Sequence, residues 1–257
     1  MSTPEAAPRV LPEISVVVPA YNEEARIAFT LPQLWQALRK RFAAFEVIVV
    51  DDGSSDATAR IVSEFAGQHQ NVRLIRHQEN HGKGHAVRAG VLAARGDIIL
   101  FSDTDLSTPI REVRKLLGAL EEGHDIAIGS RALGTTRILQ RQPFYRIGMG
   151  KIFNRLVRLL TVRGISDTQC GFKCFRRSAA LEIFPCCRID GFSFDVEVLF
   201  IARKKGLRVK EVGVIWRNSP QSKVNPVFHS LQMLRDLFVI RLHALAGSYG
   251  RRHSAPE

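Results

Sequence analysis

The sequence predicts an α/β fold with a mostly parallel central sheet flanked by helices, and three observations support this prediction. Short apolar runs, of the kind buried inside parallel sheets, alternate with longer segments whose apolar residues recur at helical spacing. Acidic or glycine-containing turns separate the two kinds of segment. At 257 residues, with 45% hydrophobic residues, the chain is large enough to bury a full core.

The first half alternates four expected strands with three expected helices. One of Ser54, Ser55 and Asp56 is expected to cap the second helix. This order is typical of a doubly wound sheet. The expected elements are a strand at 14–18, a helix at about 23–41, a strand at 46–50, a helix at about 58–68, a strand at 72–76, a helix from the turn at 81–84 through 94, and a strand at 97–102.

The second half is less regular. We expect strands at 125–129 and 209–217 and a helix at about 144–162. A C-terminal stripe at helical spacing either faces the core or lies in a membrane interface, as basic amphipathic helices can. The stripe consists of Val227, Leu231, Leu234, Phe238, Leu242 and Leu245.

The net charge of +12 is concentrated in the second half of the chain. Residues 1–128 carry 14 Lys and Arg against 17 Asp and Glu, whereas residues 129–257 carry 23 against 8. This asymmetry suggests a polyanionic partner, namely nucleic acid, an anionic membrane surface or a phosphorylated substrate, although a basic face can also serve solubility alone. The basic segments lack the regularly interleaved aromatics of single-strand binders, so nucleic acid is not expected.

Several classes of protein lack support in the sequence. There is no run of 18 apolar residues and no signal peptide, so we expect a cytoplasmic protein without a membrane-spanning helix. The four cysteines have no zinc-site spacing and are expected to be reduced packing residues. No P-loop is present, and Gly82-x-Gly84 is only a weak dinucleotide signal.

The most informative stretch is Asp103-Thr104-Asp105, which follows a buried strand. Ligands bind outside the carboxyl ends of the strands in open α/β sheets. On extended backbone, carboxylates two residues apart point the same way. They would form a hard oxygen site for Mg²⁺ or Mn²⁺, completed by water and substrate phosphates.

Two further polar clusters follow strands of the same sheet. Tyr21-Asn22-Glu23 comes after the first strand and Asp51-Asp52 after the second. Because the carboxyl ends of parallel strands share one edge, we expect all three clusters to lie there. Together they could bind a nucleoside and a metal-bridged diphosphate.

These residues and others resemble family 2 glycosyltransferases with the GT-A fold. The resemblance covers about 14–223 and is closest to the branch that transfers a sugar from a nucleotide to a polyprenyl phosphate, above all the dolichyl-phosphate β-glucosyltransferases and next the dolichyl-phosphate mannose synthases. The motifs that carry it are Val16-Val17-Val18-Pro19-Ala20-Tyr21-Asn22-Glu23, Val50-Asp51-Asp52-Gly53-Ser54, Gly82-Lys83-Gly84, Asp103-Thr104-Asp105, Gly129-Ser130-Arg131, Asp167-Thr168-Gln169-Cys170-Gly171-Phe172-Lys173 and Gly191-Phe192-Ser193-Phe194-Asp195-Val196-Glu197.

The resemblance implies a role for each matching residue. Asp103 and Asp105 would serve the metal and the diphosphate. Mannose synthases have Gln two positions after the second aspartate, and the shorter Ser107 here favours a bridging water over direct ligation. The residues implied in binding the nucleotide sugar are Pro19, Tyr21, Glu23, Val50, Asp52, Lys83, Asp103, Thr104, Arg217 and Lys223.

Arg131, Arg217 and Lys223 match family positions that contact phosphates, and Arg137 and Arg141 are further candidates for the acceptor. Asp167 could act as a base, orient an arginine or cap a helix. On the expected helix, Asp195 and Glu197 diverge, so only one of them could reach the site.

The resemblance therefore implies inverting, metal-dependent transfer of a hexose, with UDP-glucose favoured as donor, to a polyprenyl phosphate at the cytosolic face of a membrane. The alternatives are a mannose synthase that uses GDP-mannose and a family 2 transferase with a hydroxyl acceptor, which would need a committed base. Membrane contact would come from peripheral helices or a partner protein. We expect a flexible tail at 1–12, a catalytic domain at 13–225, and a C-terminal amphipathic helix and tail at 226–257.

Overall fold

A computed structural model describes residues 13–140, 148, 155, 157, 161–162, 164–218 and 226–250. The strands are β1 (Ile14–Ala20), β2 (Phe45–Asp52), β3 (Val72–His77), β4 (Ile98–Ser102), β5 (Ile126–Ser130), β6 (Arg137–Gln140), β7 (Phe172–Arg176), β8 (Val209–Gly213) and β9 (Ile215–Arg217). The α-helices are α1 (Glu24–Arg39), α2 (Thr58–Gln68), α3 (Lys83–Ala93), α4 (Val113–Glu121), α6 (Arg177–Ile183), α7 (Phe194–Lys204) and α8 (Pro226–Leu245). Two 3₁₀ turns, Ile110–Glu112 and Phe184–Cys186, accompany them.

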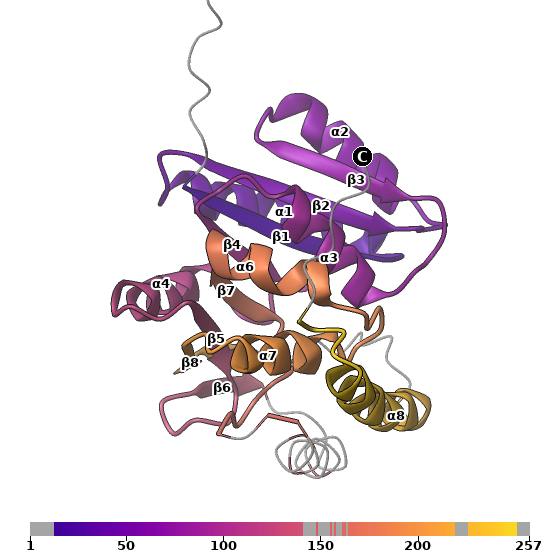
Figure 1. The fold of residues 1–257 in the computed structure, drawn as a ribbon. Coiled ribbons are helices and arrows are strands. Elements are labelled where there is room, and N and C mark those ends of the chain that lie inside the picture. The colour runs from indigo at the N-terminus through magenta and orange to yellow at the C-terminus, as the bar shows by residue number, and fades with distance from the viewer. Residues whose placement is uncertain are drawn as a thin grey trace, which may run out of the picture.

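The central sheet has seven strands in the order β3-β2-β1-β4-β7-β5-β8 (Figure 1). β7 runs antiparallel to both of its neighbours, and the other pairings are parallel. This confirms the predicted α/β class with its mostly parallel sheet. β6 and β9 form a separate two-stranded parallel sheet.

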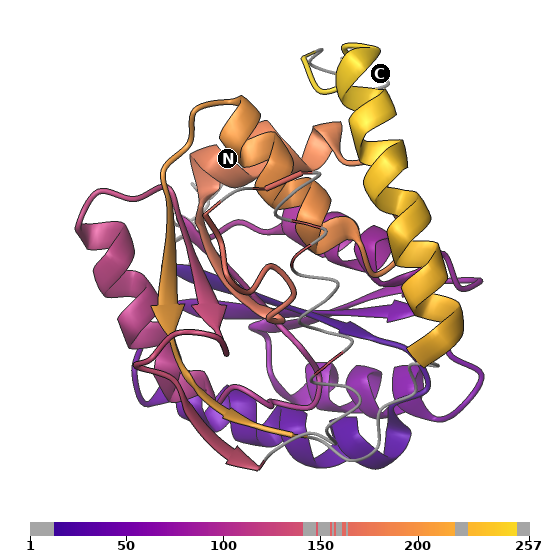
Figure 2. The ribbon, with the colours of Figure 1, turned by 90° about the horizontal axis from the view of Figure 1, so that it is seen from below.

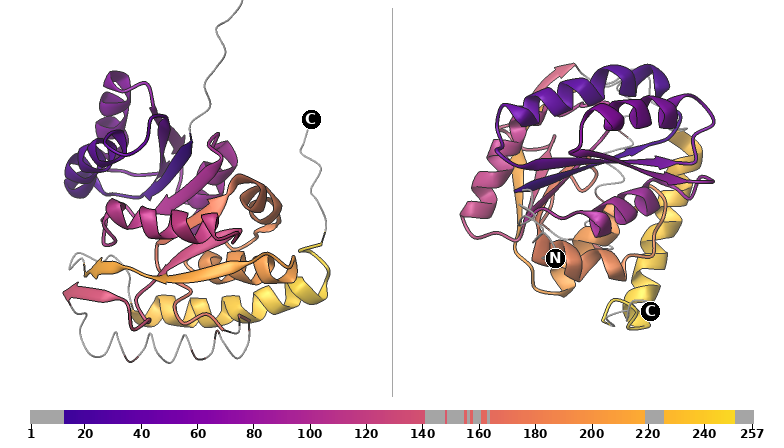
Figure 3. Two further views of the ribbon diagram at one scale, coloured as in Figure 1. Left: turned by 90° about the vertical axis from the view of Figure 1, so that its left-hand side faces the viewer. Right: turned by 90° about the horizontal axis from the view of Figure 1, so that it is seen from above.

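Helices cover both faces of the sheet. Residues of α1, α2 and α4 pack on one face, with Leu34 and Leu116 among them. Residues of α3, α6, α7 and α8 pack on the other, with Val87 and Leu199 among them. The right-hand view of Figure 3 shows the strands between α1 and α2 on one side and α3 on the other. Figure 2 shows α8 running beside this body, and its buried Leu237 and Ile240 join the same core.

The strand order reverses beside β1. The chain moves outward from β1 through β2 to β3, and β4 then returns to the other side of β1. In doubly wound sheets, ligands bind outside the carboxyl ends of the strands at such a reversal. The ends of β1 and β4 meet there, so the topology directs attention to Pro19–Glu23 and Asp103–Asp105.

The expected elements of the first half are confirmed to within a few residues at each end. The second half differs more. β7 was not expected, and the single strand expected at 209–217 is two strands in different sheets, interrupted at Val214. The expected helix at 144–162 lies mostly outside the described residues, and so does the tail at 1–12.

Among the stripe residues whose side chains are described, Leu234 packs against the core and the other three do not. Phe238 is 55% exposed, Leu242 64% and Leu245 85%, and Leu234 is partly buried. The buried face of α8 instead carries Leu237 and Ile240. The core-facing alternative is therefore wrong for the three exposed residues.

Candidate functional site

The loops after β1, β2 and β4 interlock at the carboxyl edge of the sheet. Thr104 Oγ1 donates to the carbonyl of Pro19 at 2.6 Å, which joins the ends of β4 and β1. The backbone N–H of Asn22 donates to Ser54 Oγ at 2.8 Å, which joins the loops after β1 and β2. The three polar clusters that the sequence places at strand ends therefore lie along one edge.

The residues implied in nucleoside binding divide into buried and accessible groups. Pro19 and Val50 are neighbours across β1 and β2, and both are buried. Tyr21 is 44% exposed, so its ring is accessible to a ligand. Glu23 pairs with Arg26 at 2.6 Å in the first turn of α1.

Asp52, at the end of β2, is only 3% exposed. Its carboxylate accepts hydrogen bonds from His77 Nδ1 at 2.9 Å and from the backbone N–H of Gly82 at 2.7 Å. Gly82 has a φ of 107°, which favours glycine, and its backbone can therefore turn toward Asp52. These contacts fix the orientation of the carboxylate.

Asp103 is held between two partners from other elements. Lys83 Nζ, at the start of α3, lies 2.6 Å from Asp103 Oδ1. Gly171 accepts the backbone N–H of Asp103 at 3.0 Å, and a Cβ on Gly171 would lie 1.9 Å from Asp103 Oδ2. Burial acts to lower the pKa of Lys83, but the Asp103 and Asp195 carboxylates outweigh it and raise that pKa, so Lys83 stays cationic.

The backbone at Asp105 is not extended, in contrast to the expectation from the sequence. β4 ends at Ser102, and the chain turns at Thr104 and Asp105, so these residues are not on extended backbone. The Asp105 carboxylate accepts the backbone N–H of Ser107 at 2.8 Å and the Ser107 hydroxyl at 2.7 Å. The premise that strand alternation aligns the two aspartates is therefore wrong, and the turn sets their directions instead.

Asp103 and Asp105 are nevertheless suitable donors for a hard cation. Carboxylate oxygens are the ligands that Mg²⁺ and Mn²⁺ prefer, and both side chains are partly exposed. Across the part of the chain that the structure describes, no group of three or more His, Cys, Asp or Glu could hold a metal. A cation here would need water and substrate oxygens to complete its coordination.

Arg131 and Asp167 form a bidentate ion pair beside this edge. Arg131 Nε and Nη2 donate to the two carboxylate oxygens at 2.7 and 2.8 Å, and the backbone N–H of Arg131 donates at 2.9 Å. Burial acts to raise the pKa of Asp167, but Arg131 outweighs it and lowers that pKa below its ordinary value. Of the three roles considered for Asp167, these contacts favour orienting an arginine.

A second cationic segment lies near the aspartates. The backbone N–H of Arg217, in β9, donates to the carbonyl of Ser107 at 2.9 Å, which ties β9 to the Asp105 turn. The Arg131 guanidinium also lies 5.6 Å from the centre of the Trp216 ring. Arg137 is exposed on β6, whereas Arg141 and Lys223 lie outside the described residues.

Asp195 and Glu197 diverge on α7, as helical spacing predicts. Asp195 forms a buried ion pair with Lys173 of β7, and Lys173 Nζ also donates to the carbonyl of Cys170 at 2.7 Å. Burial outweighs the nearby lysines and raises the pKa of Asp195. Glu197 is fully buried and accepts the N–H groups of Arg188 and Ile189, each at 2.9 Å.

Sequence reasoning assigned no role to Lys173 or to His77. Lys173 looks like a surface residue in a sequence, and only the antiparallel β7 brings it under Asp195. The signal available in the sequence was the position of Lys173 inside the Gly171-Phe172-Lys173 motif, next to the apolar Phe172 and Cys174. A lysine in such a run, if it is buried in a strand, needs a charged partner.

Comparison with known proteins identifies the family. The family model described as glycosyl transferase family 2 matches residues 15–184. The chain belongs to glycosyl transferase family 2. It is therefore a glycosyltransferase, and the predicted family and enzyme class are confirmed.

Curated relatives resemble this transferase over most of its length. The dolichyl-phosphate beta-glucosyltransferase of Drosophila melanogaster is 40% identical over 250 residues, which is 92% of this chain and 77% of the relative. The protein of the same name from Homo sapiens is 38% identical with the same coverage. The predicted branch of the family is thus supported by similarity over most of both chains.

Solved structures confirm the fold. Glucosyl-3-phosphoglycerate synthase from M. tuberculosis matches with a TM-score of 0.65 and 24% identity, over 95% of this chain and 82% of that one. Mannosyl-3-phosphoglycerate synthase from Rubrobacter xylanophilus also matches with a TM-score of 0.65, at 19% identity, over 96% and 77% of the two chains. In the described part of the transferase, no helix combines the length and apolar character needed to span a bilayer.

Proposed function

We propose that this transferase moves glucose from UDP-glucose to a polyprenyl phosphate such as dolichyl phosphate, with inversion at the sugar and with a divalent cation. The names of the curated relatives, dolichyl-phosphate beta-glucosyltransferase, favour this sugar and this acceptor. The observation that supports a phosphate acceptor is that the three carboxylates considered as bases, Asp167, Asp195 and Glu197, all have partners within the protein.

Each of those carboxylates is already engaged. Asp167 is paired with Arg131, Asp195 is paired with Lys173, and Glu197 accepts backbone N–H groups. A transferase with a hydroxyl acceptor needs a positioned base to remove the hydroxyl proton. These contacts suit an acceptor that needs no deprotonation.

A lipid phosphate is such an acceptor. A phosphomonoester has a second pKa of about 6, so at neutral pH it is mostly a dianion. One of its oxygens would attack C1 of the glucosyl group while the bond from C1 to the diphosphate breaks and UDP leaves. No proton has to move, and the enzyme supplies positioning and charge compensation.

We assign the charge compensation to four cationic side chains. Arg131, oriented by Asp167 and Trp216, would bind the acceptor phosphate, with Arg217 and Lys223 as further phosphate contacts. Lys83 would interact with the donor diphosphate, because it already lies beside Asp103. A cation on Asp103 and Asp105 would neutralise charge on the leaving diphosphate.

The donor preference rests on the relatives and on a structural neighbour. The M. tuberculosis synthase has been solved with Mn²⁺ and UDP-glucose, whereas a mannosyltransferase from Pyrobaculum calidifontis has been solved with GDP-Man and Mn²⁺. Both fold like this chain, so the fold alone does not select the base. The glucosyltransferase names of the 35–40% identical relatives favour UDP-glucose.

A long-chain lipid acceptor places the reaction at a membrane surface, and we propose that α8 contacts it. On a helix of 3.6 residues per turn, Phe238, Leu242 and Leu245 fall within about 60° of one another. Arg235 and Arg241 fall about 60° to either side of Phe238. All five side chains are exposed.

This arrangement is typical of helices that lie in the interface of an anionic membrane. The apolar stripe would enter the acyl boundary, while the two arginines would meet lipid phosphates. The excess of 37 Lys and Arg over 25 Asp and Glu also favours attraction to an anionic membrane. We propose a peripheral location on the cytosolic face, with a membrane protein partner as a second possible anchor.

A transfer assay tests the proposal. Purified protein is incubated with Mg²⁺ or Mn²⁺, radiolabelled UDP-glucose or GDP-mannose, and a short polyprenyl phosphate, and the organic phase is counted. Glucose in an alkali-stable, acid-labile lipid product supports the proposal. Transfer of mannose alone would show that the donor is GDP-mannose. If neither donor gives a lipid-extractable sugar, the acceptor assignment is wrong.

A further inference from the structure

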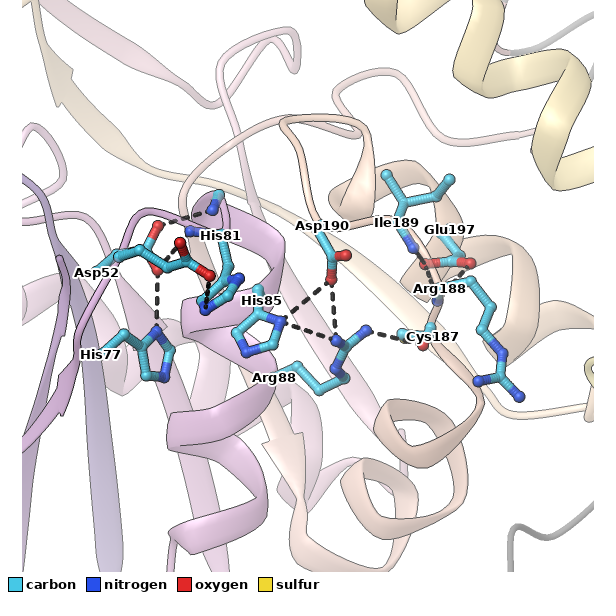
Figure 4. Close-up of polar contacts among 12 residues, drawn as sticks. Asp52, His77, His81, His85, Arg88, Cys187, Arg188, Ile189, Asp190 and Glu197 are labelled. Carbon is cyan, nitrogen blue, oxygen red and sulfur yellow. Dashed lines mark hydrogen bonds and ion pairs between the residues drawn. The ribbon is translucent and has the colours of Figure 1, made fainter.

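Three histidines lie together beside Asp52 (Figure 4). His77 ends β3, His81 lies in the turn before α3, and His85 lies in the first turn of α3. Their ring centres are 5.6 Å apart for His77 and His81, 5.0 Å for His77 and His85, and 4.7 Å for His81 and His85. Such a cluster next to a proposed nucleoside contact can influence which nucleoside binds.

The hydrogen bonds to Asp52 are unevenly divided between its two oxygens. Oδ1 accepts from His77 Nδ1 at 2.9 Å and from the backbone N–H of His81 at 3.2 Å. Oδ2 accepts from the backbone N–H of Gly82 at 2.7 Å. A carboxylate has about four lone-pair positions, two on each oxygen. With these described donors in place, one position remains, and it is on Oδ2.

His77 is fixed by the same contact. Because Nδ1 faces a carboxylate, it carries the proton and acts as the donor. The side chain is 14% exposed, so the packing around the ring also restricts it. Asp52 and His77 therefore hold each other in one orientation.

The rest of the cluster secures the start of α3 to the loop before α7. His85 Nδ1 lies 3.1 Å from Arg88 Nη2 and 3.4 Å from Asp190 Oδ1, and Arg88 Nη1 donates to the carbonyl of Cys187 at 2.9 Å. Burial and the Arg88 charge lower the pKa of His85, so this ring is neutral at neutral pH. The turn that supplies the N–H groups of His81 and Gly82 is thereby attached to the body of the protein.

We infer that His77 is a positioning residue for donor specificity. It occupies Asp52 Oδ1 and leaves a single acceptor position on Oδ2, which matches a base edge with one N–H donor. Uracil offers one such N–H, whereas guanine offers adjacent N–H and NH₂ donors that would engage both oxygens of a carboxylate. The inference rests on the proposed function, in which Asp52 contacts the nucleoside of the donor.

Binding of UDP and GDP in the presence of Mn²⁺, measured by calorimetry, tests the inference. His77→Leu removes the donor to Oδ1, and His77→Asn keeps an N–H donor near the same position. His69→Leu is the matched control, because His69 stacks on Phe65 at the end of α2, away from Asp52. Melting curves establish that each variant is folded, and His77→Ala replaces the Leu variant if that variant is not.

We expect the wild type to bind UDP at least about tenfold more tightly than GDP, since a mismatched buried hydrogen-bonding group is costly. In His77→Leu, UDP binding should weaken about tenfold and the preference over GDP should shrink, because Oδ1 becomes open to guanine. In the transfer assay, the same variant should raise the KM for the donor with kcat unchanged. His77→Asn and the control should stay within about threefold of the wild type.

Several results would overturn the inference. Unchanged UDP affinity and preference in His77→Leu would do so, and an equal loss in His77→Asn would show that the ring acts only through packing. If the wild type transfers glucose while these results are obtained, only the inference fails. If the wild type binds neither nucleotide, the proposed donor fails and the inference fails with it.

Discussion

Replacing Gly171 by alanine tests whether the position of the Asp103 carboxylate matters for catalysis. Gly171 itself has no proposed contact with a substrate. The added Cβ would lie 1.9 Å from Asp103 Oδ2, 2.3 Å from Cγ and 2.6 Å from Oδ1. A carbon atom does not approach other heavy atoms this closely without a bond, so the whole carboxylate has to move by about 1 Å or more. Gly171 is not among the glycines with positive φ, so alanine fits its backbone conformation.

The expected effect falls on catalysis more than on stability. The side chain of Asp103 is 33% exposed and can turn toward solvent, so the free energy of unfolding should change by no more than about 1 kcal/mol. Displacing a catalytic group by about 1 Å can reduce the rate about 100-fold, which corresponds to about 2.7 kcal/mol of transition-state stabilisation.

The assay compares kcat/KM for glucose transfer with the melting temperature of the same preparations. Gly118→Ala is the control, since a Cβ at this position on α4 would have nothing within 4 Å beyond the backbone of its own helix. It should retain full activity and the wild-type melting temperature or a slightly higher one. Full activity in a folded Gly171→Ala variant would refute the view that the Asp103 carboxylate must stay in its position beside Lys83 and Gly171.

Three further predictions concern the aspartates and α8. Asp105→Ala should reduce transfer at least about 1,000-fold while the protein still melts cooperatively, at a somewhat lower temperature because the two hydrogen bonds to Ser107 are lost; substantial turnover would remove Asp105 from the diphosphate site. Asp167→Asn should lower stability by about 1–3 kcal/mol at pH 7, because it leaves Arg131 without its charged partner. Since the pKa of Asp167 is lowered from 3.8, the wild-type advantage should persist above that pH and fade as the pH falls through the lower folded value; melting curves with a constant difference from pH 7 to pH 3 would contradict the ion pair as its source. Phe238→Ser with Leu242→Ser should weaken sedimentation with anionic liposomes at least about tenfold, whereas Leu181→Ser, an exposed leucine on α6, should not; equal binding by all three proteins would exclude α8 as the contact.

The sequence predicts the first half of the fold well because its strands are built on consecutive apolar residues, such as Val16–Val18 in β1 and Val47–Val50 in β2. Both strands are buried along their whole length, and apolar runs of this kind are what predicts a buried parallel strand from sequence. β7 escapes prediction because Lys173 stands within it. A buried lysine is compatible with a strand only through Asp195, which is 22 residues away.

From the sequence, we could predict which residues lie at the same edge of the sheet, because the strand order determines this. We could not predict which of several available partners a side chain contacts. Shared strand ends are enough to place Asp52 and Asp103 on one edge. The sequence left three roles open for Asp167, and only the geometry of Arg131 favours one of them. For α8, helical spacing identified the stripe, but the burial of Leu237 and Ile240 decided which face meets the core.

The acceptor class is the central claim, and a paired comparison of polyprenyl phosphate with the corresponding polyprenol tests it most directly. With UDP-glucose and Mn²⁺, we predict glucose transfer to the phosphate only, with kcat/KM level from about pH 7 to 8 and falling near the second phosphate pKa of about 6. Comparable transfer to the alcohol would contradict the account, because one of the engaged carboxylates would then have to serve as the base.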